Sequence, residues 1–441
     1  MRYHASYAWL GDRVAADVLI ETSGERFSSV VPGVPAPPDA VRLTGLTVPG
    51  LADAHSHAFH RALRGRVQAG RGTFWTWRSQ MYELAGRLDP DTYFALARAV
   101  YAEMVLAGIS CVGEFHYLHH SPSGAPYSDP NAMGSALVAA AAEAGIRITL
   151  LDTCYLAGGI GEPLTGPQIR FSDGTAAEWA SRVSSLRPPA HARVGAAIHS
   201  VRAVPRDQLG TVAAWAGLRD APLHVHLSEQ PAENAACEAA YGLSPTGLLA
   251  EAEALGPRTV AVHATHLSTA DVALLGGSRT GVCMCPTTER DLADGIGPAR
   301  TLADAGSPLS LGSDQHAVID LFEEARALEL DERLRTRQRG HWRAGELLTA
   351  ATTDGHAALG WPEAGRIEPG AYADLTTVTF DSVRLAGASP DHLVESLVFA
   401  ATAGDVRHVV VSGHDVVRDG RHLLVGDVPA ALTETITALT G

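Results

Sequence analysis

The chain has 441 residues, enough to bury a large core and to hold more than one domain. Apolar residues make up 46% and charged residues 19%, as is ordinary for a soluble globular protein. The formal charge of −15 argues against a nucleic-acid partner, because such a partner needs a basic face. We expect a cytoplasmic enzyme without a membrane span, because the chain lacks an apolar run of about 18 residues and the apolar core of a signal peptide.

The types of basic residue and the cysteines narrow the possible chemistry. All 34 basic residues are arginine, so Schiff-base catalysis by a lysine and a metal pair bridged by a modified lysine are both excluded. The 5 cysteines are few and odd in number, so we do not expect a disulfide framework.

Both ends of the chain have the texture of short strands. Residues 3–10, 14–21 and 26–31 precede a proline-rich stretch, and strand patterns return at 374–380, 406–411 and 416–418. Neither end can bury a good core alone. We therefore expect one small β-sandwich domain assembled from residues 1–45 and 365–441.

Between these ends, apolar runs alternate with helical patterns. Eight runs fall at residues 47–54, 109–115, 146–154, 192–198, 222–227, 259–263, 280–284 and 308–311. Segments with apolar residues at three- and four-residue spacing lie between most of them. The alternation predicts an α/β fold with a TIM (β/α)8 barrel over residues 46–364.

The carboxyl ends of the predicted barrel strands carry many polar side chains, and these ends form the catalytic face of a TIM barrel. A lone histidine there is more often a packed residue than a ligand. So many at one face indicate a metal site. The residues are His55, His57, Glu114, His116, Tyr117, His199, Arg202, His224, His226, Glu229, His263, His266, Asp314 and His316.

Four of these side chains make a suitable ligand set for one divalent metal: His55, His57, His226 and Asp314. Three imidazole nitrogens and one carboxylate suit Zn²⁺ or Fe²⁺ and leave room for a water. Glu229 lies three residues after His226, where it could take a proton from that water.

Seven short motifs are similar to those of a known family. They are His-Ser-His-Ala-Phe at 55–59, Phe-Trp-Thr-Trp-Arg at 74–78, Glu-Phe-His-Tyr at 114–117, His-Ser-Val-Arg at 199–202, His-Leu-Ser-Glu-Gln at 226–230, Cys-Pro-Thr-Thr-Glu at 285–289 and Gly-Ser-Asp-Gln-His at 312–316. Together they resemble the amidohydrolase superfamily in its mononuclear deaminase branch, and within it the formimidoylglutamate deiminases.

The resemblance implies hydrolysis of N-formimidoyl-L-glutamate to N-formyl-L-glutamate and ammonia, a step of histidine degradation. It implies one zinc ion on the four ligands named above, catalysis by Glu229, His263 and Asp314, and substrate contacts from Arg78, Tyr117, His199 and Arg202. His263 could orient the attacking water or stabilise the tetrahedral adduct.

The resemblance has one departure at a substrate-binding position. His60 stands where family members often carry glutamine. Either His60 replaces the glutamine hydrogen bond or the substrate is somewhat different.

The residues themselves favour an anionic small-molecule substrate. Two carboxylates call for arginine, whose guanidinium pairs with a carboxylate through two parallel bonds, and Arg78 and Arg202 are the candidates. We interpret Trp75 and Trp77 as packing residues of a loop over the site. We further expect a homodimer.

Two alternatives remain open. One is another deaminase or a cyclic amidohydrolase of the same barrel, acting on a guanine-like base, an imidazolone ring or a related amidine. The other is a non-catalytic barrel that serves as a scaffold, against which the complete ligand set and Glu229 argue.

Overall fold

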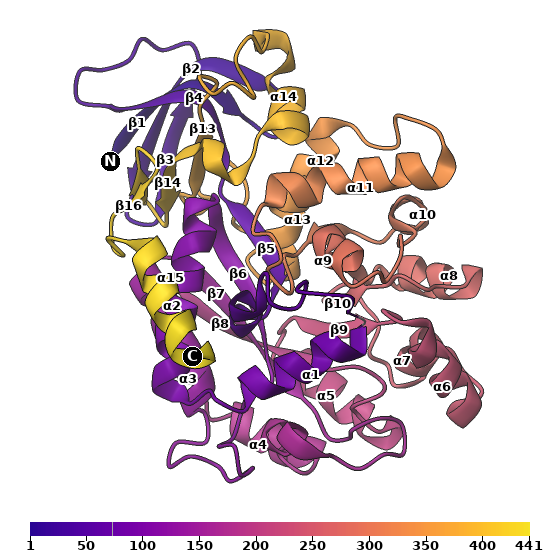
Figure 1. Ribbon diagram of the computed structural model, residues 1–441. Helices are drawn as coiled ribbons and strands as arrows, with labels where there is room; N and C mark the ends of the chain where they lie inside the picture. The colour runs from indigo at the N-terminus through magenta and orange to yellow at the C-terminus, as the bar shows by residue number, and fades with distance from the viewer. Residues whose placement is uncertain (73) are drawn as a thin grey trace.

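The computed structural model describes residues 1–72 and 74–441, and for Phe74 and Trp75 it describes the backbone only. Two eight-stranded sheets organise the chain (Figure 1). One is a parallel barrel, and the other is a mixed sheet built from both ends of the chain. In the part that is described, we find no helix long and apolar enough to cross a membrane.

The barrel strands follow one another in chain order and are parallel throughout. A bridge between Ser56 and Asp314 joins the first strand to the segment after the last one and closes the ring. The predicted TIM barrel is therefore confirmed. Its strands are β5 (Leu51–Ser56), β6 (Ile109–His116), β7 (Arg147–Cys154), β8 (Ala192–Ile198), β9 (Leu223–Leu227), β10 (Thr259–His263), β11 (Gly281–Met284) and β12 (Leu309–Leu311).

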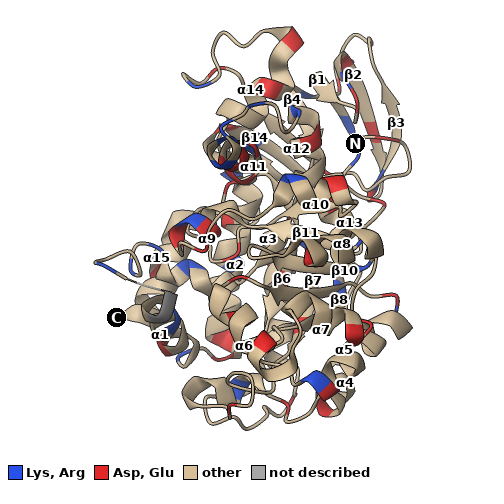
Figure 2. Ribbon diagram, turned by 90° about the vertical axis from the view of Figure 1, so that its right-hand side faces the viewer, with Lys and Arg blue, Asp and Glu red and all other residues tan. Residues whose placement is uncertain are grey.

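Helices surround the barrel, and their ends follow local sequence rules. Asp89 caps α2 by accepting a hydrogen bond from the backbone N–H of Thr92 at 2.8 Å, and Pro90 fills the first helical position. Charged residues lie on these helices, as on α4, α9 and α11 in Figure 2. The helices are α2 (Pro90–Leu106), α3 (Ala132–Ala144), α4 (Ala176–Val183), α5 (Arg206–Leu218), α6 (Pro231–Tyr241), α7 (Pro245–Glu251), α8 (Thr269–Ser278), α9 (Pro286–Asp291), α10 (Ala299–Ala305), α11 (Leu321–Thr336), α12 (Ala344–Ala351) and α13 (Thr353–Ala358).

The terminal strands form one mixed sheet with its own apolar core, which includes Tyr3, Phe27 and Val410. Its curvature brings β3 against a distant segment, where the N–H of Phe27 donates to the carbonyl of Ala371 at 3.0 Å. In sheet order the strands are β16 (Arg421–His422), β15 (His414–Arg418), β14 (Val406–Val411), β13 (Leu375–Val378), β4 (Val41–Pro49), β1 (Arg2–Trp9), β2 (Val14–Ser23) and β3 (Arg26–Val31). Two helices also come from the C-terminal segment, α14 (Leu393–Ala400) and α15 (Val428–Thr440), and α15 packs beside α2 (Figure 1).

The apolar run at residues 47–54 is divided between the two sheets, which corrects the prediction of a single barrel strand. β4 ends at Pro49 and β5 begins at Leu51. A Cβ atom on Gly50 would lie 2.4 Å from the hydroxyl oxygen of Ser110 and 2.8 Å from the Cβ of Asp374. Because any side chain at position 50 would clash with these atoms, only glycine fits here. It lets the chain pass directly from one sheet to the other without a loop.

The aromatic segment at residues 74–78 is the second correction. It belongs to a helix, α1 (Phe74–Ala85), and not to a loop. Helical spacing places Arg78 and Tyr82 on the same face, one turn apart.

Candidate active site

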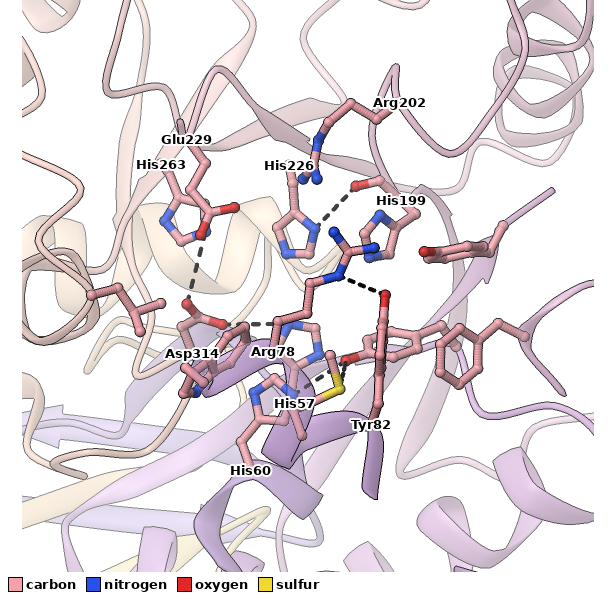
Figure 3. A pocket seen from close by; sticks show the side chains of 16 residues that line it. His57, His60, Arg78, Tyr82, His199, Arg202, His226, Glu229, His263 and Asp314 are labelled. Carbon is pink, nitrogen blue, oxygen red and sulfur yellow. Dashed lines mark hydrogen bonds and ion pairs between the residues drawn. The ribbon is translucent and has the colours of Figure 1, made fainter. Parts of the chain in front are cut away.

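Four side chains converge at the carboxyl end of the barrel. The Nε2 atom of His55 lies 3.0 Å from Nε2 of His226 and 3.3 Å from Oδ1 of Asp314. Nε2 of His57 lies 3.4 Å from the same carboxylate oxygen. Figure 3 shows His57, His226 and Asp314 on the floor and wall of one pocket. The residues chosen from the sequence as metal ligands are thus neighbours in space.

Backbone carbonyls fix how two of the imidazoles are oriented. Nδ1 of His57 lies 2.9 Å from the carbonyl oxygen of Phe115, and Nδ1 of His226 lies 3.0 Å from that of His199. A carbonyl can only accept, so each Nδ1 carries the proton and each Nε2 lone pair faces the cluster. Burial, with the neighbouring His55, lowers the pKa of His57 to about 3, which keeps its imidazole neutral.

Asp314 supplies the negative charge of the cluster. Burial opposes its ionisation, but the hydrogen bond with His55 and the nearby His263 hold its pKa below the usual value. Its backbone N–H donates to the carbonyl of His55 at 2.9 Å, so the bond that closes the barrel also places the carboxylate. Three neutral imidazoles and one carboxylate fit a divalent metal and leave a position for water.

Two buried acids support the segment that carries the first histidine pair. Asp53 accepts from the backbone N–H groups of Ser313 at 3.0 Å and His55 at 3.3 Å. Glu114 accepts from the N–H of Ala58 at 2.8 Å. Burial raises the pKa of Asp53 to about 7 and that of Glu114 to about 8. These contacts fix the backbone on both sides of the His55–His57 pair.

Glu229 and His263 lie beside the cluster and line the same pocket (Figure 3). Glu229 is 8% exposed, and burial raises its pKa above the usual value. Burial disfavours the charged form of His263, yet Glu229 and Glu289 together raise its pKa well above the usual value. Nε2 of His263 lies 3.8 Å from Oδ2 of Asp314. One group can therefore accept a proton where the other donates a hydrogen bond.

All residues predicted to contact the substrate line the same pocket. Arg202 donates from Nε to Oε2 of Glu233 at 3.2 Å, and Arg78 donates from Nε to the hydroxyl of Tyr82 at 2.8 Å. Among the described residues, the lining is His57, His60, Trp77, Arg78, Met81, Tyr82, Tyr117, Tyr155, Phe171, His199, Arg202, His226, Glu229, His263, Leu292 and Asp314.

His60 also lies in this wall, on the short 3-10 helix η1 (Ala58–Leu63) that follows β5. Its Nε2 lies 3.2 Å from the hydroxyl of Tyr117, and its ring meets that of Trp77 edge-on with centroids 5.4 Å apart. The side chain of Trp75 lies outside the described residues.

Sequence reasoning overlooked several residues in or beside the pocket, among them four polar ones. Tyr82 follows Arg78 by one helical turn, but a loop was expected there, so helical spacing was not applied to this segment. Tyr155 directly follows β7, the one early barrel strand whose end carries no histidine. Gln168 and Glu233 reach the site through side-chain contacts that no sequence motif signals.

A closed parallel barrel with histidines and a carboxylate gathered at its carboxyl end, where they could hold a metal, is typical of a metal-dependent hydrolase. Residues 46–416 match the model of the Amidohydrolase family, and the chain belongs to this family. It is 38% identical over 432 residues to a formimidoylglutamate deiminase of Pseudomonas aeruginosa, covering 95% of each chain.

Two further relatives show how far the similarity extends. An 8-oxoguanine deaminase of Pseudomonas aeruginosa is 28% identical over 384 residues, which cover 85% of this chain and 83% of the relative. The crystal structure of an amidohydrolase from Brucella melitensis superposes with a TM-score of 0.92 at 34% identity, covering all of both chains.

Proposed function

We propose that this protein hydrolyses N-formimidoyl-L-glutamate to N-formyl-L-glutamate and ammonia. One observation carries the proposal: the pocket that holds the histidine cluster, Glu229 and His263 also contains two arginines, Arg78 and Arg202. The planar amidine end of the substrate would face the histidine cluster with Glu229 and His263. Its two carboxylates would face Arg78 and Arg202. The 38% identity to a formimidoylglutamate deiminase supports the same substrate.

We propose zinc as the metal, held by His55, His57, His226 and Asp314. The donor set of three imidazoles and one carboxylate agrees with this choice. When bound, such an ion supplies a Lewis acid that makes water a nucleophile near neutral pH.

The residues around the metal site would perform the proton transfers. Glu229 accepts a proton from the water that attacks the formimidoyl carbon, because burial gives its carboxyl a raised pKa. His263 donates a hydrogen bond to the oxygen that becomes the formyl carbonyl. Glu229 then delivers its proton to the nitrogen that leaves as ammonia, and the carboxylate of Asp314 accepts the remaining hydroxyl proton as the C–N bond breaks and the formyl C=O bond forms. Arg78 and Arg202 hold the carboxylates so that the formimidoyl carbon is within reach.

A base deaminase is the second candidate, and the 8-oxoguanine deaminase among the relatives favours it. A purine carries no carboxylate for Arg78 and Arg202 to bind, whereas N-formimidoyl-L-glutamate carries two. We therefore rank this function below deimination.

The test is ammonia release by zinc-loaded protein from three compounds: N-formimidoyl-L-glutamate, N-formimidoylglycine and guanine. We expect turnover of the glutamate compound and at least about 100-fold lower kcat/KM for the glycine compound, because one charge-assisted pair is lost. Release from guanine alone would overturn the proposal.

A further inference from the structure

Two tyrosines of the pocket wall are not explained by the residue roles assigned so far. Tyr82 lies on α1, one turn after Arg78, and Tyr155 directly follows β7. Both line the pocket. Tyr155 is buried with its ring 4.4 Å from that of His199, and Tyr82 is half-buried under the guanidinium of Arg78 (Figure 3). Their hydroxyls therefore sit among the residues proposed to bind carboxylate.

The side chain of Gln168 determines what these hydroxyls can do. Its Oε1 accepts from the backbone N–H of Thr165 at 2.9 Å. A backbone N–H can only donate, so the oxygen end of the amide must face Thr165 and the NH₂ end must face the tyrosines. Nε2 donates to the hydroxyl oxygens of Tyr155 at 2.9 Å and Tyr82 at 3.1 Å. Gln168 is 2% exposed, so solvent does not compete for these bonds.

A count of the lone pairs on the two tyrosine hydroxyls shows that at least one hydroxyl proton has no acceptor within the pair. Arg78 adds a third N–H bond, from Nε to the hydroxyl of Tyr82 at 2.8 Å. Each phenolic oxygen has two lone pairs and one proton, so three of the four lone pairs are already used. At most one of the two protons can bond within the pair. At least one hydroxyl proton is therefore directed away from it.

We propose that Tyr82 and Tyr155 are anion-binding residues that donate a hydroxyl proton to a substrate carboxylate beside Arg78, and that Gln168 is the positioning residue that fixes this polarity. The proposal rests on the proposed function and specifies how one carboxylate is recognised. Burial and the neighbouring Tyr82 raise the pKa of Tyr155, so its hydroxyl keeps the proton at neutral pH.

The first test removes the hydroxyls in the zinc-loaded enzyme with Tyr82→Phe, Tyr155→Phe and the double variant. Calorimetry would measure the Kd of N-formyl-L-glutamate and of glutarate, a dicarboxylate without a formyl group. We expect the double variant to bind both about 10- to 100-fold more weakly, as for a lost charge-assisted hydrogen bond. Tyr3→Phe, which removes a hydroxyl bonded to Asp415 at 3.0 Å in the terminal sheet, is the matched control.

The second test uses Gln168→Glu to replace the hydrogen-bond donor that faces the two tyrosine hydroxyls with an acceptor. One carboxylate oxygen can still accept from Thr165, but the other would accept the tyrosine protons and withdraw them from the pocket. We expect a loss of glutarate affinity at least as large as in the double variant, with unchanged zinc content. Gln168→Met, which neither donates nor accepts strongly, should fall between wild type and Gln168→Glu.

The outcomes separate this proposal from the proposed function. Absence of ammonia release from N-formimidoyl-L-glutamate by wild type would refute the function, whereas the glutarate measurements concern the hydroxyls alone. Equal glutarate affinity in wild type and the double variant would overturn the proposal, and so would wild-type protein that binds no dicarboxylate.

Discussion

At the scale of single residues, several site positions have a backbone conformation that their side chains rarely adopt. Positive φ angles occur at His263 (67°), Asp314 (44°) and Ser228 (51°), beside the metal cluster. Such conformations cost free energy and persist where surrounding contacts impose them. No motif indicates these angles. The motifs predict which residues meet, whereas the geometry with which they meet comes from barrel closure.

Glu229→Gln tests the proton-transfer role. The amide cannot accept a proton from water, so kcat should fall by about 10²–10⁴-fold. Metal content by elemental analysis should stay at one ion per chain, because Glu229 is not among the four ligands. Loss of the metal together with activity would make Glu229 a ligand and contradict the role proposed for it.

Substitutions of His60 test whether this histidine replaces the hydrogen bond of the glutamine that family members often carry. Its Nε2 lies 3.2 Å from the hydroxyl of Tyr117, a contact that glutamine can also make. His60→Gln should therefore keep kcat/KM for N-formimidoyl-L-glutamate within about tenfold. His60→Leu should lose about 10- to 100-fold, because the buried hydroxyl of Tyr117 loses its bond to His60 and keeps only the weak acceptor sulfur of Met81 at 3.7 Å. Equal loss in both variants would show that the ring itself, and not its hydrogen bond, matters.

At the scale of elements, the sequence placed strands better than helices that border the site. The predicted strands at 192–198 and 259–263 match β8 and β10 without a shift, because each run is short and follows a proline-containing turn segment, which favours a strand over a helix. α1 was missed because Phe-Trp-Thr-Trp favours a strand locally, and packing over the pocket overrides that preference. The division at Gly50 depends on two sheets meeting there, which local sequence cannot show.

Arg170 connects the elements over the pocket. It is fully buried and donates to the backbone carbonyls of Ala85, Leu88 (2.9 Å) and His120 (3.0 Å). Arg170→Met leaves three carbonyls without this donor and should cost about 3 kcal/mol of unfolding free energy. It should also raise KM, because α1 carries Arg78.

Chemical denaturation and limited proteolysis around α1 would measure these effects. Arg187→Met is the matched control, since Arg187 is exposed and bonds only nearby carbonyls. If Arg170→Met left both the unfolding free energy and KM unchanged, the hydrogen bonds of Arg170 would not stabilise the position of α1.

At the scale of the whole molecule, a buried ion pair joins the barrel to the terminal sheet. Arg147, the first residue of β7, donates from Nη1 to Oδ1 of Asp374 at 2.8 Å, and Asp374 also accepts from the N–H of Ser412 at 2.8 Å. Both charged side chains are about 1% exposed. The sequence indicated a domain shared by both chain ends but not this contact, whose partners lie 227 residues apart.

The ion pair predicts acid sensitivity. Burial opposes ionisation of Asp374, but Arg147 holds its pKa below the ordinary value. The resulting stabilisation is present above the unfolded pKa, about 3.9, and is lost as pH falls through the lower folded value. Asp374→Asn, which leaves the buried Arg147 charge unpaired, should cost about 3–5 kcal/mol at neutral pH.

Unfolding free energies measured at neutral pH and at successively lower pH would test this. The wild-type curve should fall more steeply below about pH 4 than the Asp374→Asn curve, because only wild type can lose this carboxylate charge. Asp39→Asn, which removes an exposed ion pair with Arg2, should change neither the unfolding free energy at neutral pH nor the steepness of its fall at low pH. Parallel curves for wild type and Asp374→Asn would contradict the assignment.

The most direct test of the account is to identify the products formed from N-formimidoyl-L-glutamate labelled with ¹³C in the formimidoyl group, by NMR. Attack of water with loss of the terminal nitrogen predicts labelled N-formyl-L-glutamate and one equivalent of ammonia. Labelled formamide with free glutamate would mean that the other C–N bond breaks, and it would contradict the proton delivery assigned to Glu229.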